Sequence, residues 1–249
     1  MKEKKIIILS VNSEIGSSVA LDFIKKKNSV IGTYNNKTKI INELKKKGVV
    51  LYKLDLKNKK KVDMVAKKIL SKSKNWDYLV SATGSLEPIS SILKSNIDKW
   101  ESSIYINCLG QIRFLKNLLI KNKKKRKILF FAGGGTNNAI KNYSAYTLSK
   151  ILLIKFVELL DFEEKLINVG ILGPGYIETK LHKKKINNKE NQKKKLNKVI
   201  KFVNWFFLKS KKIVSGRNFS LINDEWGSKK LDNLLKKNQD LYKLRRFGN

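Results

Sequence analysis

Short apolar runs alternate with amphipathic segments along most of the chain. The first run, residues 6–9, consists of four consecutive aliphatic side chains, which is typical of a strand buried on both faces of a parallel sheet. In the segment that follows, residues 17–27, Val19 and Phe23 lie four positions apart on one helix face. The same alternation then recurs, and it predicts a series of βαβ units.

The predicted elements are strands at residues 6–9, 29–33, 49–54, 78–81, 128–131 and 167–172, and helices at 17–27, 37–47, 59–71, 96–119 and 144–162. Right-handed crossovers between such units give a Rossmann-type α/β fold, a doubly wound and mostly parallel sheet with helices on both faces. No linker or repeat divides the chain, so we expect one domain over residues 1–249. The Lys- and Asn-rich residues 183–200 depart from the pattern and are expected to form an exposed, mobile insertion near the substrate pocket.

The charge of the chain is its most conspicuous compositional feature. The 249 residues contain 55 Lys and Arg against 20 Asp and Glu, a formal net charge of +35. Only five of the basic residues are arginine, and the lysines are spread over the whole chain among many Asn and Ile residues, as expected from an AT-rich genome. The charge therefore reflects composition and solvated faces, and a basic nucleic-acid-binding protein remains a remote alternative.

Several classes of protein are excluded by residue content. Cys108 and His182 are the only cysteine and histidine, which removes intramolecular disulfides, Cys-rich zinc sites and His-based triads, and no metal site is predicted. No apolar run approaches the ~20 residues that a bilayer requires. Residues 6–9 are too few for a signal-peptide core, so we expect a cytoplasmic protein without a membrane partner.

Tyr146 and Lys150 form the strongest candidate for chemistry. Their spacing of four residues places both side chains on one face of the predicted helix 144–162. In a cleft, the ammonium group would lower the pKa of the phenol from about 10 toward neutrality and make it a usable general acid or base. The pair occurs by chance in many lysine-rich chains, so its significance depends on the neighbouring motifs.

Six motifs in the expected order support it. They are Ser144-Ala145-Tyr146 with Ser149-Lys150, the segment Pro174-Gly175-Tyr176-Ile177-Glu178-Thr179, Asp55 after the third strand, Ser81-Ala82-Thr83-Gly84 after the fourth, Asn107, and Ser215-Gly216-Arg217. With them the sequence resembles the short-chain dehydrogenase/reductase family. The triple glycine before Tyr146 resembles a subgroup of that family with a GGG loop.

The resemblance implies an oxidoreductase that interconverts a small-molecule carbonyl and an alcohol by hydride transfer with a nicotinamide cofactor. It implies that Tyr146 donates or accepts the proton, that Lys150 binds the nicotinamide ribose and lowers the pKa of the tyrosine, and that Asn107 holds a water. It also implies a homodimer or homotetramer. The residues that it implies for cofactor binding are Ser10, Asn12, Ile15, Gly16, Asn35, Lys37, Asp55, Leu56, Ala82, Gly84, Tyr146, Lys150, Pro174, Gly175, Ile177 and Thr179.

The substrate side of the site departs from the family pattern. Gly133 stands where relatives carry a serine that hydrogen-bonds the substrate oxygen, and Ala132 precedes it. Either Thr136 or a backbone N–H of the glycine loop replaces the serine, or catalysis is weakened. Gly133 and Thr136 are therefore the candidate substrate-binding residues.

The phosphate-binding loop departs as well. Residues 9–16 keep only Gly16 of the family's glycine pattern, and Glu14 stands at a glycine position where its charge could repel a diphosphate. A catalytically weak or silent Rossmann protein that binds a nucleotide or a protein partner is the alternative. After the second strand, residues 33–37 lack the acidic residue typical of NAD-specific relatives. Asn35 and Lys37 could accept a 2′-phosphate, so NADP(H) is predicted over NAD(H).

Overall fold

The computed structural model describes residues 2–119, 124–176 and 189–245, and within them seven strands form one sheet. The strand order is β3-β2-β1-β4-β5-β6-β7, and every neighbouring pair is parallel. The strands are β1 (Lys5–Leu9), β2 (Ser29–Tyr34), β3 (Val50–Lys53), β4 (Tyr78–Ser81), β5 (Arg126–Phe131), β6 (Ile167–Gly173) and β7 (Asn218–Ser220). The predicted doubly wound sheet is confirmed, and it is parallel throughout rather than mostly parallel.

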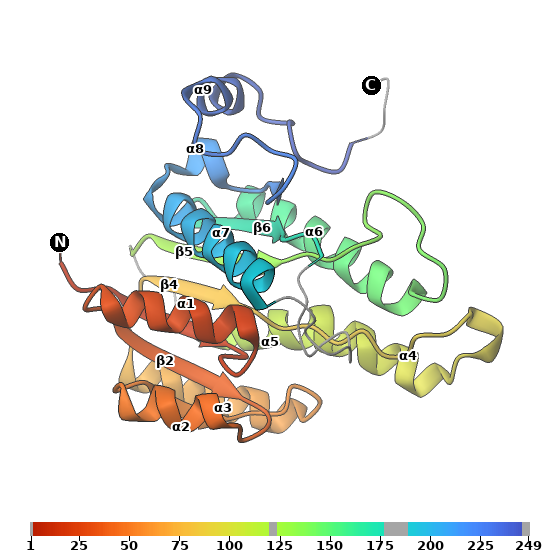
Figure 1. The fold of residues 1–249 in the computed structure, drawn as a ribbon, viewed down its shortest axis with the longest axis horizontal. Helices are drawn as coiled ribbons and strands as arrows, with labels where there is room; N and C mark the ends of the chain where they lie inside the picture. Colours follow the sequence, from red (N-terminus) through yellow and green to blue (C-terminus); the bar gives the residue numbers. More distant parts are fainter. Residues whose placement is uncertain (1, 120–123, 177–188, 246–249) are drawn as a thin grey trace.

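Helices cover both faces of the sheet (Figure 1). They are α1 (Glu14–Lys25), α2 (Lys39–Lys46), α3 (Lys59–Lys72), α4 (Ile97–Ile104), α5 (Gly110–Leu118), α6 (Ser144–Glu163), α7 (Lys189–Leu208), α8 (Lys211–Val214) and α9 (Lys229–Lys237). Side chains of α1, α2 and α7 share one hydrophobic core, and side chains of α3, α5 and α6 share the other. The chain thus folds as a single Rossmann-like domain with two core layers.

Strand β1 shows why the first apolar run is uninterrupted. Ile6 and Ile8 point into the core beneath α1 and α7, whereas Ile7 and Leu9 point into the core beneath α3 and α5. All four side chains are buried. A central parallel strand needs apolar residues at every position because successive side chains face opposite layers.

The predicted helix 96–119 is present but is not regular. Helices α4 and α5 are joined by one π-helical turn, Tyr105–Leu109, which contains Asn107. The extra residue in this turn changes the direction in which the following side chains point. Such turns occur often at functional sites, and this one lies beside the pocket described below.

The predicted insertion 183–200 needs correction. Residues 183–188 lie outside the described residues, but residues 189–200 form the first turns of α7. Val199 is buried in the core that α7 shares with α1, so this part is the largely exposed start of a packed helix and not a separate insertion. The many lysines conceal a helical pattern whose apolar positions become continuous only from Leu196 onward.

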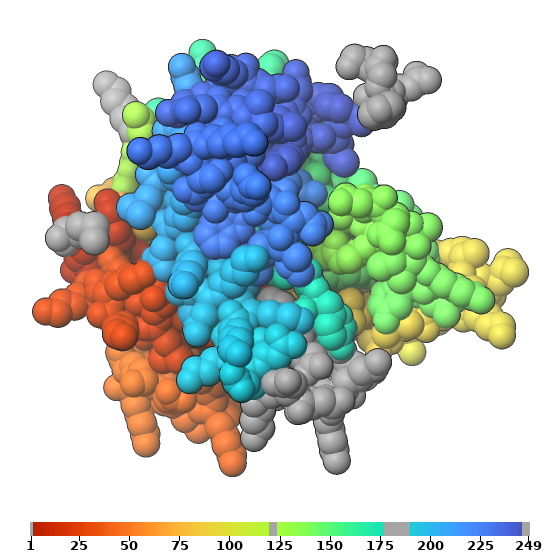
Figure 2. Space-filling view, turned by 45° about the horizontal axis from the view of Figure 1, so that its top comes forward, coloured from red at the N-terminus to blue at the C-terminus, as the bar shows by residue number. Residues whose placement is uncertain are grey.

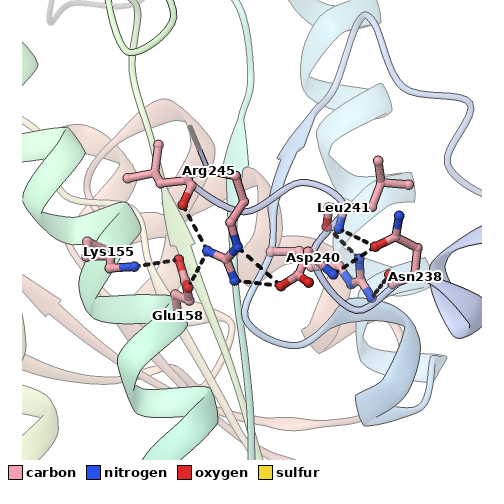
Figure 3. A network of polar contacts seen from close by, with 8 residues as sticks. Lys155, Glu158, Asn238, Asp240, Leu241 and Arg245 are labelled. Atoms are coloured by element: carbon pink, nitrogen blue, oxygen red, sulfur yellow. Dashed lines mark hydrogen bonds and ion pairs between the residues drawn. The ribbon is translucent and has the colours of Figure 1, made fainter. Parts of the chain in front are cut away.

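The C-terminal segment with α8 and α9 lies at the β6 end of the sheet (Figure 1), and it forms the blue surface in Figure 2. It is tied to α6 by Arg245, which binds Glu158 at 2.6 Å and Asp240 at 2.7 Å (Figure 3). The buried guanidinium of Arg217 donates to the main-chain carbonyls of Leu235 at 2.7 Å and Asn238 at 3.0 Å. In the described part of the chain, no helix is both long and apolar enough to span a bilayer.

Candidate active site

A pocket of about 430 Å³ lies at the carboxyl ends of β1, β4, β5 and β6. Strand order reverses here, because β1 pairs with β2 on one side and β4 on the other, which is where ligands bind in open parallel sheets. The residues that line it are Ile15, Ala82, Thr83, Gly84, Leu86, Phe131, Ala132, Gly133, Gly134, Ile140, Tyr143, Tyr146, Lys150, Pro174, Gly175 and Tyr176. Eight of the predicted site residues are among them.

Tyr146 and Lys150 lie on the buried face of α6 and both reach the pocket. Tyr146 is 8% exposed and Lys150 is 1% exposed. The Lys150 Nζ donates hydrogen bonds to the carbonyl oxygens of Phe131, at 2.9 Å, and Thr83, at 3.2 Å, at the ends of β5 and β4. It lies 5.8 Å from the centre of the Tyr146 ring. The spacing of four residues therefore places both groups in one site, as predicted.

The expected lowering of the tyrosine pKa is wrong for this structure. Burial raises the pKa of Tyr146 to about 12, and burial also lowers the pKa of the Lys150 amine to about 8. The ammonium is bound to two carbonyl groups rather than to the phenol oxygen. Removal of both groups from water therefore outweighs the attraction between them.

Asn107 supports the site indirectly, through the loop that follows β4. It is fully buried in the π turn and does not line the pocket. Its Oδ1 accepts from the backbone N–H of Ser85 at 2.8 Å, and its Nδ2 donates to the carbonyl of the same residue at 2.8 Å. Its own carbonyl accepts a hydrogen bond from Gln111 at 2.6 Å. The side chain of Asn107 thus holds the loop after β4, and its predicted role toward a water stays a prediction.

The loop after β1 is compact although it has lost most of its glycines. Ser10 adopts a left-handed conformation with φ +64°, a region that glycine usually occupies. Its Oγ lies 2.7 Å from Thr83 Oγ1, and its carbonyl accepts from Ser13 Oγ at 2.9 Å. Ser13 also caps α1, since its Oγ accepts from the N–H of Gly16 at 3.0 Å. Serine hydroxyls therefore hold the turn that glycines form in relatives.

Gly16 has a steric reason to be glycine. A Cβ atom at this position would lie 2.5 Å from the carbonyl oxygen of Ser10 and 2.9 Å from Ser13 Oγ. The first turn of α1 therefore packs directly on the loop, and Ile15 beside it faces the pocket. The one glycine that the sequence retains is the one that this packing requires.

Five predicted cofactor residues lie outside the pocket, toward β2 and β3, namely Asn12, Asn35, Lys37, Asp55 and Leu56. Asn12 Nδ2 donates to Asn35 Oδ1 at 2.8 Å, so the loops after β1 and β2 are joined. Lys37 is exposed beyond them. Asp55 is exposed and accepts from the backbone of its own turn, and Leu56 is buried.

Of the two candidate substrate residues, only Gly133 lines the pocket. The Thr136 hydroxyl donates to the carbonyl of Gly133 at 3.4 Å and thus faces the loop backbone. Pro174 and Gly175 border the pocket after β6, and Gly175 has φ +70°. The predicted cofactor residues Ile177 and Thr179 lie outside the described residues.

Several pocket residues were not among the site residues predicted from the sequence. They are Thr83, Leu86, Phe131, Ile140, Tyr143 and Tyr176. Thr83 and Phe131 lie at predicted strand ends, a position that could have identified them. The others lie on loops, which carry no periodic signal. Among the described residues, no group of three or more His, Cys, Asp or Glu side chains is placed to bind a metal ion.

Comparison with known proteins agrees with the fold. The model of the family described as enoyl-(acyl carrier protein) reductase matches residues 10–206, which is most of the chain. The chain belongs to the short-chain dehydrogenase/reductase family. Members of this family are NAD(P)-dependent oxidoreductases, and the function implied by the sequence motifs is therefore confirmed at that level.

Individual relatives of this dehydrogenase/reductase chain are distant. A 3-oxoacyl-(acyl-carrier-protein) reductase FabG from Buchnera aphidicola is 29% identical over 192 residues, which cover 74% of this chain and 77% of the relative. A short-chain dehydrogenase from Shigella flexneri, solved with NADP, has a TM-score of 0.77 at 17% identity over 89% of this chain and 98% of its own. A Saccharomyces cerevisiae member has a TM-score of 0.75 at 19% identity, over 89% and 97% of the two chains.

Proposed function

We propose that this dehydrogenase/reductase uses NADP(H) to interconvert a small-molecule carbonyl and an alcohol, with Tyr146 as the proton donor and acceptor. The observation that carries the proposal is the placement of Tyr146 and Lys150 together on the wall of the pocket where the strand order reverses. In the reduction direction, the Oη–H bond of Tyr146 breaks as an O–H bond forms on the substrate oxygen. Nothing in the comparisons favours the catalytically silent alternative.

The residues present fit a nicotinamide group. The pocket has the volume of a small-molecule site and offers a buried amine, the Lys150 Nζ, within a wall that is otherwise largely apolar. Ile15, Ala82, Gly84, Pro174 and Gly175 would hold the ring, and Lys150 would bind the ribose hydroxyls. When bound, this cofactor supplies or accepts the hydride.

The diphosphate and the adenosine would lie along the ends of β1, β2 and β3. Ser10, Asn12 and Gly16 would bind the diphosphate at the amino end of α1, where the helix dipole favours an anion. Asp55 and Leu56 would border the adenine. Ile177 and Thr179, which follow β6 in the sequence, would also bind the cofactor.

Titration with each cofactor tests the proposed function and the preference for NADP(H) over NAD(H). Asn35 and Lys37 lie after β2, and residues 33–37 carry no carboxylate that would repel a 2′-phosphate. We expect NADPH to bind about tenfold more tightly than NADH, because one charged hydrogen bond contributes about 1.5–3 kcal/mol. Binding is measured by nicotinamide fluorescence. Lys37→Glu should reverse the order, whereas Lys39→Glu, on the outer side of α2, should not. Absence of saturable binding of either cofactor at near-millimolar concentration would refute the proposed function.

We also propose that the enzyme is a homodimer or a homotetramer assembled through α6. Leu148, Leu152, Leu159 and Phe162 follow one another along one side of this helix, and all are at least 45% exposed. Leu109, from the π turn that packs on α6, is exposed to a similar degree. An apolar stripe on a rigid helix suits a twofold interface in which the same surface serves both copies.

Leu152→Glu is expected to dissociate the oligomer, because the interface would bury two uncompensated carboxylates related by the twofold axis. Light scattering on a sizing column measures the mass directly. Leu234→Glu on α9 is the matched control, since Leu234 is 49% exposed against 48% for Leu152. A mass that does not change in Leu152→Glu would contradict the assignment of this surface.

A cytoplasmic location stays a prediction, and nucleic-acid binding stays the remote alternative.

A further inference from the structure

Gly133 packs directly against the ring of Tyr146. A Cβ atom on Gly133 would lie 2.0 Å from Tyr146 Oη, 2.4 Å from Cζ and 2.6 Å from Cε1. Non-bonded atoms in protein interiors do not approach so closely. The phenol group therefore occupies the volume that any side chain at position 133 would require.

The neighbouring glycines show that this contact is specific. A Cβ atom on Gly135 would lie 2.6 Å from Thr147 Oγ1, and this residue also has φ +84°. A Cβ atom on Gly134 would reach only Ile140 Cδ1, at an ordinary 3.4 Å. Gly133 and Gly135 thus let the loop pack onto the first turn of α6, whereas Gly134 is not sterically required for that contact.

We propose that Gly133 is a positioning residue for Tyr146, and that the phenol takes the place of the serine that relatives carry at this position. This inference rests on the proposed function. The Tyr146 hydroxyl then makes the hydrogen bond to the substrate oxygen and also transfers the proton, so that one group performs both tasks. Thr136 does not substitute for the serine, because its hydroxyl is turned toward the Gly133 carbonyl.

If Gly133 only lacked a catalytic side chain, a serine at this position would be expected to raise kcat. The proposal predicts the opposite. Gly133→Ser, which restores the serine of relatives, should lower kcat rather than raise it, because the new Cβ displaces the phenol. We expect Gly133→Ser and Gly133→Ala to lower kcat by about tenfold to 10²-fold, the loss that a misplaced group causes. The Kd for the cofactor should stay within about twofold, since Gly133 is not among the residues that would hold the cofactor. An increase of kcat in Gly133→Ser would overturn the proposal.

A double-mutant cycle on stability tests the packing without any use of activity. Gly133→Ala should lower the Tm of the otherwise unchanged chain by about 3–10 °C, as overpacking does in a chain of this size. In the Tyr146→Ala background the same substitution should have little effect, because the ring is gone. Gly134→Ala is the control from the same loop and should lower the Tm much less than Gly133→Ala. Equal Tm losses in the two backgrounds would overturn the proposal.

The two experiments separate failure of this proposal from failure of the proposed function. A chain that binds neither cofactor refutes the oxidoreductase function, and the stability cycle still decides whether Gly133 positions Tyr146. If Gly133→Ala does not fold, the proposal requires that Gly133→Ala combined with Tyr146→Ala does fold, and failure of the combined variant would contradict it.

Discussion

Tyr146→Phe is expected to lower kcat by about 10²- to 10⁴-fold, the range that a positioned general acid or base contributes. The substitution removes only the hydroxyl group and keeps the ring that packs against Gly133. Affinity for NADPH should therefore change little, and the effect should appear in kcat and kcat/KM alike. Steady-state kinetics with a panel of small carbonyl compounds, together with the fluorescence titration, measures both quantities.

Tyr78→Phe is the matched control for this experiment. Tyr78 begins β4, at the amino end of this strand and away from the pocket, and its ring stacks on Phe207 with centroids 4.2 Å apart. Removal of its hydroxyl should leave turnover unchanged. Turnover of Tyr146→Phe at the level of the unmodified enzyme would refute Tyr146 as the proton donor and leave the family assignment intact.

Lys150→Met should produce the second large effect, a loss of cofactor affinity of about 10- to 100-fold. Hydrogen bonds from a charged group contribute about 1.5–3 kcal/mol, and the amine of Lys150 is the only ammonium among the residues that line the described pocket. The loss should appear in kcat/KM as well, because weaker binding of the cofactor also lowers kcat/KM. Binding and kinetics are measured as for Tyr146→Phe.

The same substitution should remove a pH-dependent part of the stability. Burial lowers the pKa of Lys150 from 10.5 to about 8. Between these values the unfolded chain holds a proton that the native chain has lost, so the free energy of unfolding rises with pH in this interval. Below about pH 8 the Lys150 amine is protonated in both the native and the unfolded state, and the native state is destabilised by the full cost of the buried charge.

The unmodified enzyme should therefore gain stability relative to Lys150→Met between about pH 8 and pH 10 in urea unfolding. Cys108 has the opposite effect, because burial raises its pKa from 9.0 to about 11, but its contribution largely cancels in the difference. Lys155→Met, on the exposed side of the same helix, should show no such gain. A difference that does not vary with pH would show that the Lys150 amine is hydrated in solution.

Up to β6, the boundaries of the strands and helices could be predicted to within three residues. Strand 78–81 coincides with β4, and helix 144–162 differs from α6 by one residue at its end. These elements are buried on defined faces, so their apolar periodicity is strong. The start of α7 could not be predicted, since the lysines of residues 189–195 show no apolar face.

For the site, the sequence by itself determined which segments meet, because strand ends in a parallel sheet converge and a spacing of four residues selects one helix face. Tyr146, Lys150 and the segments after β1, β4 and β6 follow from these two rules. Only the tertiary structure decided the contacts between loops, such as Asn12 with Asn35 and Gly133 with Tyr146. It also decided the pKa direction of Tyr146. These properties depend on distances across the fold and on removal from water, and neither is encoded in the spacing of residues along the chain.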